Sequence, residues 1–285
     1  MAQPTSRLRP RQAKATLLDQ PRYELMPISG VMDQAATLPP GAVVTVTSSP
    51  RQGAAATVDL AVQLAERGLR AVPHLAARQL HDREELITIL DRLEAAGIDN
   101  VFVVGGDAAE PAGPYPDGLT LLEAIAALGR LPRHVGIPSY PDGHHAIDDA
   151  TLLTALKSKQ LYATYTVSQM CFDAARIGRF SRALRGQGIT LPIYAGIPGV
   201  VDMAKLLRVS LRIGVGDSVR FLRGNKAAAG RLIRPRGYRP DGLVRKLGAQ
   251  VREGKADLAG LHIYTFNHID ATVRWTHGNR RRVAS

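Results

Sequence analysis

The chain has 285 residues, a formal net charge of +12 and one cysteine, Cys171. This length fits one large α/β domain or two small ones. A single cysteine excludes an intramolecular disulfide and a cysteine-based zinc cluster, and it favours a reducing compartment. No apolar run reaches the roughly 20 residues of a membrane helix, and the N-terminus lacks the apolar core of a signal peptide. We therefore expect a cytoplasmic globular protein with no membrane partner and no bound metal.

Much of the positive charge lies near the two ends of the chain. Arg7, Arg9, Arg11 and Lys14 precede any acidic residue, and 280–282 is a run of arginines. We expect residues 1–20 to form a flexible basic arm, because terminal runs of like charge are usually solvated. Nucleic acid and an anionic small ligand both suit a basic protein. Since no basic stripe interleaved with aromatic residues lies between the ends, we favour the small ligand and expect no nucleic-acid partner.

Eight segments have the β-branched and aromatic composition of short strands, and most are followed by a segment with helical spacing of apolar residues. The predicted strands are 22–27, 42–47, 70–77, 100–107, 134–140, 162–169, 191–199 and 260–266. The predicted helices are 53–67, 82–96 with Asp82 as its N-cap, 119–128, 148–160, 174–186 and 202–213, followed by a basic, mostly helical region at 214–255 and a tail that contains Trp275.

The segment 100–107 shows most clearly how these strands end. Four apolar residues in a row, 101–104, indicate a strand buried on both faces, as in a parallel sheet. Gly105, Gly106 and Asp107 then end it. Glycine and aspartate are ordinary turn residues, but an acid just after a buried parallel strand also lies where α/β proteins place their chemistry.

The alternation of eight strands with helices predicts a (β/α)₈ TIM barrel in a single domain at 21–285. Right-handed crossovers and burial on both faces favour closure of the sheet. An open doubly wound sheet is the competing architecture, and no Gly-x-Gly-x-x-Gly motif follows the first strand to support it.

Polar and reactive residues stand at nearly every predicted strand end. On its own, His74 could be a satisfied core histidine, and Gln169 could merely satisfy the backbone. The carboxyl ends of all eight strands meet at one rim of a barrel, however, and active sites lie there. The residues at these ends are Glu24, Thr47, Ser48, His74, Asp107, Tyr140, Gln169, Tyr264 and Asn267.

Seven short motifs in these positions resemble, in order, those of the methylenetetrahydrofolate reductase family, whose members are (β/α)₈ barrels. Each fragment is weak alone, but their order from Tyr23 to His268 makes the set specific. The matching segments are Tyr23-Glu24-Leu25-Met26-Pro27, Val46-Thr47-Ser48, Pro73-His74-Leu75, Gly106-Asp107, Tyr140-Pro141-Asp142-Gly143-His144, Ser168-Gln169 with Phe172-Asp173, and Tyr264-Thr265-Phe266-Asn267.

The resemblance implies an NAD(P)H-dependent oxidoreductase that reduces 5,10-methylenetetrahydrofolate to 5-methyltetrahydrofolate. By position, Glu24 is similar to the family's general acid, which protonates the nitrogen at position ten so that the ring opens to an iminium. Asp107 resembles the carboxylate that contacts the pterin and favours the developing positive charge. The resemblance assigns substrate binding to Gln169, Tyr264, Thr47 and Ser48, and cofactor binding to His74, Gly106, Tyr140, His144 and Lys159.

The departures from the family pattern concern FAD, which most members bind. Gly105 replaces an arginine before Gly-Asp, and Leu152, Ala155 and Ser158 stand where an acid, an amide and an arginine are expected. A diphosphate without cationic or N–H partners loses its charge-assisted bonds. The chain therefore resembles the flavin-independent branch, in which NADH passes hydride directly to the folate. His268 also replaces the arginine that often follows the last motif, so folate contacts there would differ.

Four alternatives remain open from the sequence. The first is an FAD-dependent reductase whose cofactor contacts have moved, and the second is a deazaflavin-dependent reductase of the same barrel type. The others come from different classes: a basic nucleic-acid-binding protein, and a catalytically dead barrel used as a partner module. Retention of Glu24 and Asp107 argues against the dead barrel. We expect folate and nicotinamide small molecules as partners and a monomer or small homo-oligomer. The choice of NADH over NADPH is inferred from the family.

Overall fold

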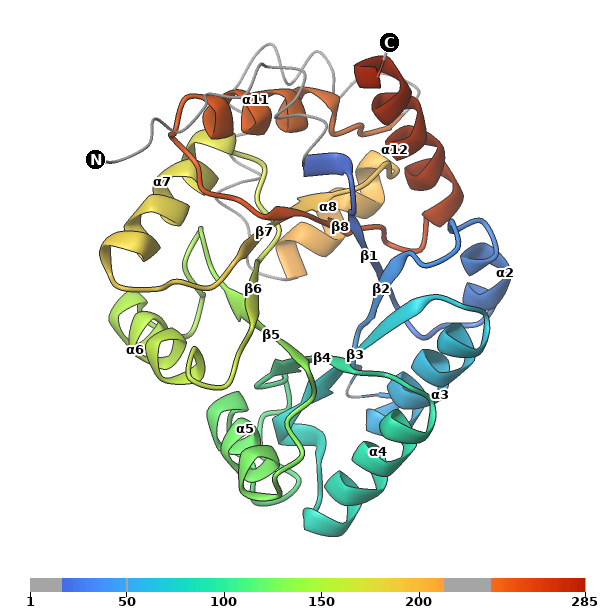
Figure 1. Cartoon of the computed structure of the whole chain (residues 1–285), viewed down its shortest axis with the longest axis vertical. Coiled ribbons are helices and arrows are strands. Elements are labelled where there is room, and N and C mark those ends of the chain that lie inside the picture. The colour runs from blue at the N-terminus through green and yellow to red at the C-terminus, as the bar shows by residue number, and fades with distance from the viewer. Residues whose placement is uncertain (1–16, 50, 213–236, 285) are drawn as a thin grey trace, which may run out of the picture.

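The computed structural model describes residues 17–49, 51–212 and 237–284. Eight parallel strands form one closed barrel in the order of the sequence, with each strand paired to the next and β8 paired to β1 (Figure 1). The predicted (β/α)₈ barrel is therefore confirmed. The strands are β1 (Arg22–Leu25), β2 (Val43–Val46), β3 (Arg70–Ala76), β4 (Asn100–Val104), β5 (His134–Ser139), β6 (Tyr165–Ser168), β7 (Ile193–Pro198) and β8 (Gly260–Tyr264).

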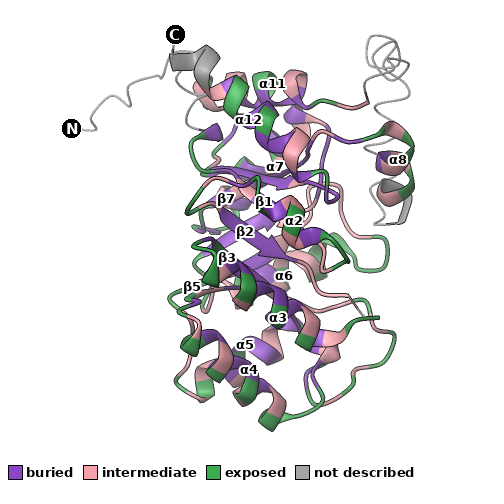
Figure 2. Cartoon of the chain, turned by 90° about the vertical axis from the view of Figure 1, so that its right-hand side faces the viewer, coloured by how far each residue is buried: buried purple, intermediate pink, exposed green. Residues whose placement is uncertain are grey.

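Helices surround the barrel, and their exposed faces point outward while their buried faces pack on the strands (Figures 1 and 2). Five helices of the described chain begin directly after an aspartate whose side chain accepts hydrogen bonds from backbone N–H groups of the first turn, among them the predicted cap Asp82. The helices are α2 (Val31–Ala35), α3 (Gly53–Glu66), η1 (Ala77–Gln79, a 3₁₀ turn), α4 (Arg83–Ala95), α5 (Gly118–Ala127), α6 (Asp149–Lys159), α7 (Ala174–Gly186), α8 (Met203–Arg212), α11 (Asp241–Arg252) and α12 (Ile269–Ala284).

The predicted tail after the last strand is in fact the 16-residue helix α12. Its apolar residues Ile269, Val273 and Trp275 are buried in the main core, and Tyr23 Oη lies 2.8 Å from Thr276 Oγ1. Apolar patterning did not reveal this helix because polar residues, Thr272, Thr276 and Asn279, occupy part of its buried stripe. Most of the predicted basic region lies outside the described residues, apart from 237–255.

The beginning of the described chain also packs on the barrel. Leu17 and Leu18 are fully buried, and Arg280 donates a 2.5 Å hydrogen bond from Nε to the carbonyl oxygen of Leu18 and another to that of Asp19. Of the expected basic arm, residues 1–16 lie outside the described residues, Leu17 and Leu18 belong to the hydrophobic core, and Asp19 and Gln20 are exposed. No helix in the described part of the chain has the length and apolar character needed to cross a membrane.

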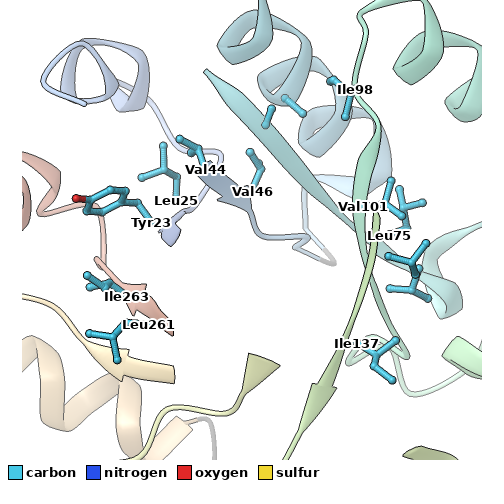
Figure 3. Close-up of a cluster of buried hydrophobic side chains, with 14 of the residues drawn as sticks. Tyr23, Leu25, Val44, Val46, Leu75, Ile98, Val101, Ile137, Leu261 and Ile263 are labelled. Atoms are coloured by element: carbon cyan, nitrogen blue, oxygen red, sulfur yellow. The ribbon is translucent and has the colours of Figure 1, made fainter. Parts of the chain in front are cut away.

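The strand side chains form two separate apolar layers. Outward-facing residues such as Leu25, Val46 and Ile263 pack beneath the helices (Figure 3). Inward-facing Val43, Val72, Phe102, Tyr165 and Val167 fill the inside of the barrel. The alternation follows from the two-residue period of a strand, and it directs every second residue of each strand into the interior.

An arginine stacked between two aromatic rings closes the amino-terminal end of the barrel. The guanidinium carbon of Arg22 lies 3.9 Å from the ring centre of Tyr165 and 4.0 Å from that of Tyr194. Tyr165 Oη donates a 3.0 Å hydrogen bond to Asn100 Oδ1, and burial raises the pKa of Tyr165 to about 12. Because Arg22, Asn100 and Tyr165 are the first residues of their strands, this cluster forms the floor of the barrel.

Gly136 in β5 tests how tightly the interior is packed. A Cβ at this position would lie 2.4 Å from Tyr165 Cε2 and 2.5 Å from Phe102 Cδ2. We expect Gly136→Ala to lower the free energy of unfolding by about 1–3 kcal/mol, as overpacking of a core does. Urea denaturation followed by circular dichroism would measure it. Gly186→Ala in α7 is the control, because a Cβ there meets nothing within 4 Å; equal stability of the two variants would contradict the tight packing.

Candidate active site

Glu24 lies inside the barrel on β1, two residues above Arg22. Its Oε2 is 3.2 Å from His262 Nε2, and the Glu24 side chain is 15% exposed whereas that of His262 is 2% exposed. The carboxyl group is thus held on one side by a buried imidazole and is open to the mouth of the barrel on the other. Sequence analysis did not single out His262, although its place two residues before Tyr264 on the same strand face could have indicated it.

The backbone around Glu24 is fixed by the segment that follows β8. Thr265 Oγ1 donates a 2.5 Å hydrogen bond to the carbonyl oxygen of Glu24. The side-chain amide of Asn267 accepts from Met26 N at 2.9 Å and donates to Met26 O at 3.1 Å. Phe266 and Asn267 adopt φ angles of 52° and 57°, a left-handed conformation that non-glycine residues rarely adopt. This turn brings the Asn267 amide beside β1, where it continues the ladder of hydrogen bonds beyond the end of β8.

Two tyrosines connect Glu24 to the opposite side of the mouth. Tyr264 Oη donates a 3.2 Å hydrogen bond to the carbonyl oxygen of Ser168. Burial raises the pKa of Tyr264 well above its ordinary value, and the charges of Glu24 and Tyr140 act in the same direction. Burial likewise raises the pKa of Tyr140, and Asp107 adds to the effect. Because each of these groups is close enough to affect the pKa of its neighbour, Glu24, Tyr264, Tyr140 and Asp107 lie around one mouth.

Asp107 is exposed in the loop after β4, and Arg78 holds that loop in place. The Arg78 side chain donates hydrogen bonds to the carbonyl oxygens of Ala108 (2.7 Å), Ala109 (2.5 Å) and Pro116 (2.9 Å). Gly106 has φ +94°, and a Cβ there would lie 3.2 Å from the Cβ of Ala76. Glycine therefore suits this position for its conformation and for the close approach of β3. No pattern in the sequence identifies Arg78, because its three partners are all backbone atoms.

His144 lies in the loop after β5, next to Tyr140. The two rings meet edge to face with their centres 5.2 Å apart, and His144 stacks on His145 at 4.5 Å. Burial and the neighbouring His145 lower the pKa of His144, while the negative charge of Asp107 opposes them. The predicted cofactor residues Gly106, Tyr140 and His144 are therefore close to Asp107.

His74 lies within β3, inside the barrel, and not in a strand-end loop. Its ring packs against Phe102 with centres 4.7 Å apart, and its buried Nε2 has no hydrogen-bond partner among the described residues. Burial, together with a smaller electrostatic effect of His262, lowers the pKa of His74 to about 3. The imidazole is therefore neutral at physiological pH and lies in the same interior layer as the Glu24–His262 pair.

The predicted substrate-binding residues differ in how far the protein itself occupies their polar groups. Ser48 Oγ donates a 2.7 Å hydrogen bond to Gln79 Oε1 in η1, and Thr47 N donates to Leu25 O at 2.9 Å. Gln169 Oε1 accepts a 2.8 Å hydrogen bond from the N–H of Met170. Because Gln169 N also donates to Ser139 O at 2.7 Å, the residue is fixed at the carboxyl end of β6.

Lys159, the fifth predicted cofactor residue, is at the last position of α6. Burial lowers the pKa of Lys159, and the carboxylate of Asp117, which caps α5, opposes that effect. Leu152, Ala155 and Ser158 recur every three residues along the same helix. Because residues three apart share a helix face, this face of α6 presents an apolar residue, a methyl group and a hydroxyl.

The sequence model of methylenetetrahydrofolate reductase matches residues 28–277 of this chain. The chain belongs to the methylenetetrahydrofolate reductase family. Membership supports a reductase activity on methylenetetrahydrofolate. Glu24 precedes the matched segment, but its strand pairs with β8, which lies within that segment. The mouth of the barrel is therefore the candidate active site.

Solved structures similar to this chain share low identity with it. They include a deoxyribose phosphate aldolase from Aeropyrum pernix (14% identity, TM-score 0.47, covering 94% of this chain and 92% of the other). A putative lyase/mutase from Burkholderia cenocepacia J2315 has 12% identity and a TM-score of 0.47 and covers 95% and 87%. A chitinase from Rhizomucor miehei has 9% identity and a TM-score of 0.37 and covers 65% and 71%. Similarity at this level carries no argument about activity.

The lowered pKa of His74 makes a prediction about stability and pH. The unfolded chain binds a proton at His74 below about its ordinary value of 6.5, whereas the folded protein does so only below about 3. Stability should therefore fall as pH decreases through this window, by up to about 1.4 kcal/mol per pH unit from this one group. Urea denaturation of wild type and His74→Leu at pH 7, 6 and 5 would measure it.

We expect His74→Leu to have the shallower dependence of unfolding free energy on pH, because leucine binds no proton in either state. His81→Leu is the matched control, since the His81 side chain is 71% exposed. Parallel pH dependences for wild type and His74→Leu would contradict the buried, neutral state of His74.

Proposed function

We propose that this protein reduces 5,10-methylenetetrahydrofolate to 5-methyltetrahydrofolate by direct hydride transfer from NADH, without a flavin. The observation that carries the proposal is the placement of Glu24 and Asp107 around one mouth, linked through Tyr264 and Tyr140. One acid is enclosed and hydrogen-bonded, and the other is exposed at the rim. Two carboxyl groups in such different surroundings can perform two different roles.

Glu24 is suited to act as the general acid. General acid catalysis needs a positioned proton donor within hydrogen-bond reach of the reacting atom. The clamp formed by Thr265 and Asn267 fixes the backbone of Glu24, and His262 holds its Oε2. In the proposed reaction, Glu24 gives its proton to the nitrogen at position ten, the bond from that nitrogen to the bridging carbon breaks, and an iminium forms on the folate.

Asp107 is suited to stabilise that iminium. A fixed negative charge beside a developing positive charge lowers the energy of the transition state, provided that it needs no reorganisation during the reaction. The three hydrogen bonds from Arg78 to the loop provide this rigidity. Gln169 offers the pterin edge the donors of its amide group.

The residues of α6 and the end of β4 do not fit a bound FAD. A flavin diphosphate needs cations or N–H groups, yet Gly105, Leu152, Ala155 and Ser158 supply no charge, and Lys159 interacts with Asp117. These losses support a protein that works without flavin. When bound, NADH supplies the hydride, and we propose that it binds beside the folate near Gly106, Tyr140, His144 and His74.

The remaining parts of the proposal concern surroundings and partners. The net charge of +12 would attract anionic folate and NADH, which is the role we propose for it instead of nucleic-acid binding. We propose a monomer or small homo-oligomer in the cytoplasm. The choice of NADH over NADPH rests on the resemblance to the flavin-independent branch.

Replacing the general acid would test the central role. Glu24→Gln keeps the size and an acceptor oxygen but removes the transferable proton. We expect kcat to fall by at least about 100-fold, the low end for general acid catalysis, while folate binding measured by equilibrium titration stays within about threefold. Glu66→Gln on α3 serves as the control for the loss of one carboxylate. Near-normal turnover of Glu24→Gln would move the role to another group.

The cofactor can be tested by absorbance and by kinetics. We expect the purified protein to be colourless and its activity to be unchanged by added FAD. Direct transfer needs both substrates bound together at near-attack distance, roughly 3–3.5 Å between the reacting atoms. Double-reciprocal plots should therefore intersect. Parallel lines, or about one flavin bound per chain, would support the FAD-dependent reductase instead.

A further inference from the structure

We propose that His262 is a positioning residue that donates its Nε2–H to Glu24 Oε2 and thereby places the transferable proton of Glu24 on Oε1. The inference rests on the proposed function, because it concerns the proton that Glu24 delivers. It goes further by assigning the two oxygens of the carboxyl group different roles. Oε2 is a permanent acceptor, and Oε1 is the atom that carries the proton to the substrate.

The geometry places His262 on one side of the carboxyl group. In the pairing of β1 with β8, Glu24 is in register with Tyr264, and His262 is in register with Arg22. His262 therefore approaches Glu24 from one step nearer the floor of the barrel, with 3.2 Å between Nε2 and Oε2. The mouth of the barrel lies on the other side of the carboxyl, toward Oε1.

The second nitrogen of His262 decides which tautomer the ring adopts. Nδ1 is buried and has no hydrogen-bond partner among the described residues. A buried N–H without an acceptor is costly, and so is a buried charge without a partner. The ring therefore carries its single proton on Nε2, where Glu24 accepts it.

Other rings and charged groups of the interior also lie around His262. The ring of His74, fully within the same layer, interacts electrostatically with His262. Tyr264 packs on His262 with ring centres 4.9 Å apart, and the cation Arg22 is its neighbour in register. The titratable and charged groups of the interior around the pair are Arg22, Glu24, His74, Tyr140, Tyr165, Tyr194 and Tyr264.

The proposed step balances as follows. The O–H bond at Glu24 Oε1 breaks, an N–H bond forms at position ten of the folate, and the electrons of the O–H bond remain on the carboxylate. The Nε2–H of His262 then stabilises that carboxylate as a charge-assisted hydrogen bond, which is stronger than the one it made to the neutral acid. His262 itself neither gains nor loses a proton.

Two substitutions separate a donor from a proton carrier. His262→Gln can keep an N–H near the position of Nε2, whereas His262→Leu cannot. We expect kcat of His262→Leu to fall by about 10- to 100-fold, the effect of losing a hydrogen bond to a charged group, with KM changed less than about threefold. His262→Gln should recover most of the rate. Equal loss in both variants would overturn the donor role, because a proton carrier cannot be replaced by an amide.

The exposed pair of His81 and Glu85 provides the matched control. His81 Nδ1 lies 2.9 Å from Glu85 Oε2, at the start of α4 on the surface. His81→Leu and His81→Gln should leave kcat and KM at wild-type values. A loss of rate in these variants similar to that in His262→Leu would show that the assay reports general destabilisation and would overturn the assignment.

A spectroscopic measurement without substrate tests the tautomer directly. In ¹⁵N NMR of histidine-labelled wild-type protein, the two ring nitrogens of His262, assigned with His262→Gln, should show Nε2 protonated and Nδ1 unprotonated at neutral pH. A proton on Nδ1, or on both nitrogens, would overturn the proposal. The NMR result does not depend on turnover. If the protein failed to reduce methylenetetrahydrofolate, the proposed function would be contradicted, but the spectrum would still decide the tautomer of His262.

Discussion

The closure of the barrel between β1 and β8 is the constraint on which the site depends. Backbone pairing brings Glu24 next to Tyr264, and the side chains of Thr265 and Asn267 then hold the carbonyl of Glu24 and both polar groups of Met26. The general-acid candidate and its imidazole partner come from opposite ends of the sequence, 238 residues apart. Their hydrogen bond therefore forms only when the last strand is in place, so catalytic geometry and completion of the fold are coupled.

Much of the fold could be predicted from the sequence, because apolar runs ended by Gly, Pro and polar residues mark buried parallel strands. The strand order around the barrel followed from connection rules. The helix α12 could not be predicted, since half of the buried positions among its described residues are the polar residues Thr272, Thr276 and Asn279, which hide its buried stripe in the sequence. Strand ends were placed one to three residues too late, as in 100–107, because glycine and aspartate can continue a run in sequence while the backbone has already turned away.

The site was predictable where function requires a particular residue at a strand end and unpredictable where a residue acts on its neighbours. Glu24, Asp107 and Gln169 belong to the first kind. His262 and Arg78 belong to the second: their partners are a distant carboxyl and three loop carbonyls. Such contacts are set by tertiary geometry and leave no local pattern. Gly105, Leu152, Ala155 and Ser158 replace the FAD-contacting residues of the family, and this could be recognised only because the sequence resembles that family.

The stacked arginine on the floor of the barrel bears on the charge of the interior during turnover. Arg22 and Glu24 are two residues apart on the same face of β1, roughly 7 Å at strand spacing. In the proposed reaction, the side chains of Arg22 and Glu24 together carry one positive charge before Glu24 gives up its proton and no net charge afterwards. Arg22 would thus supply in advance the counter-charge that the carboxylate of Glu24 needs inside the barrel.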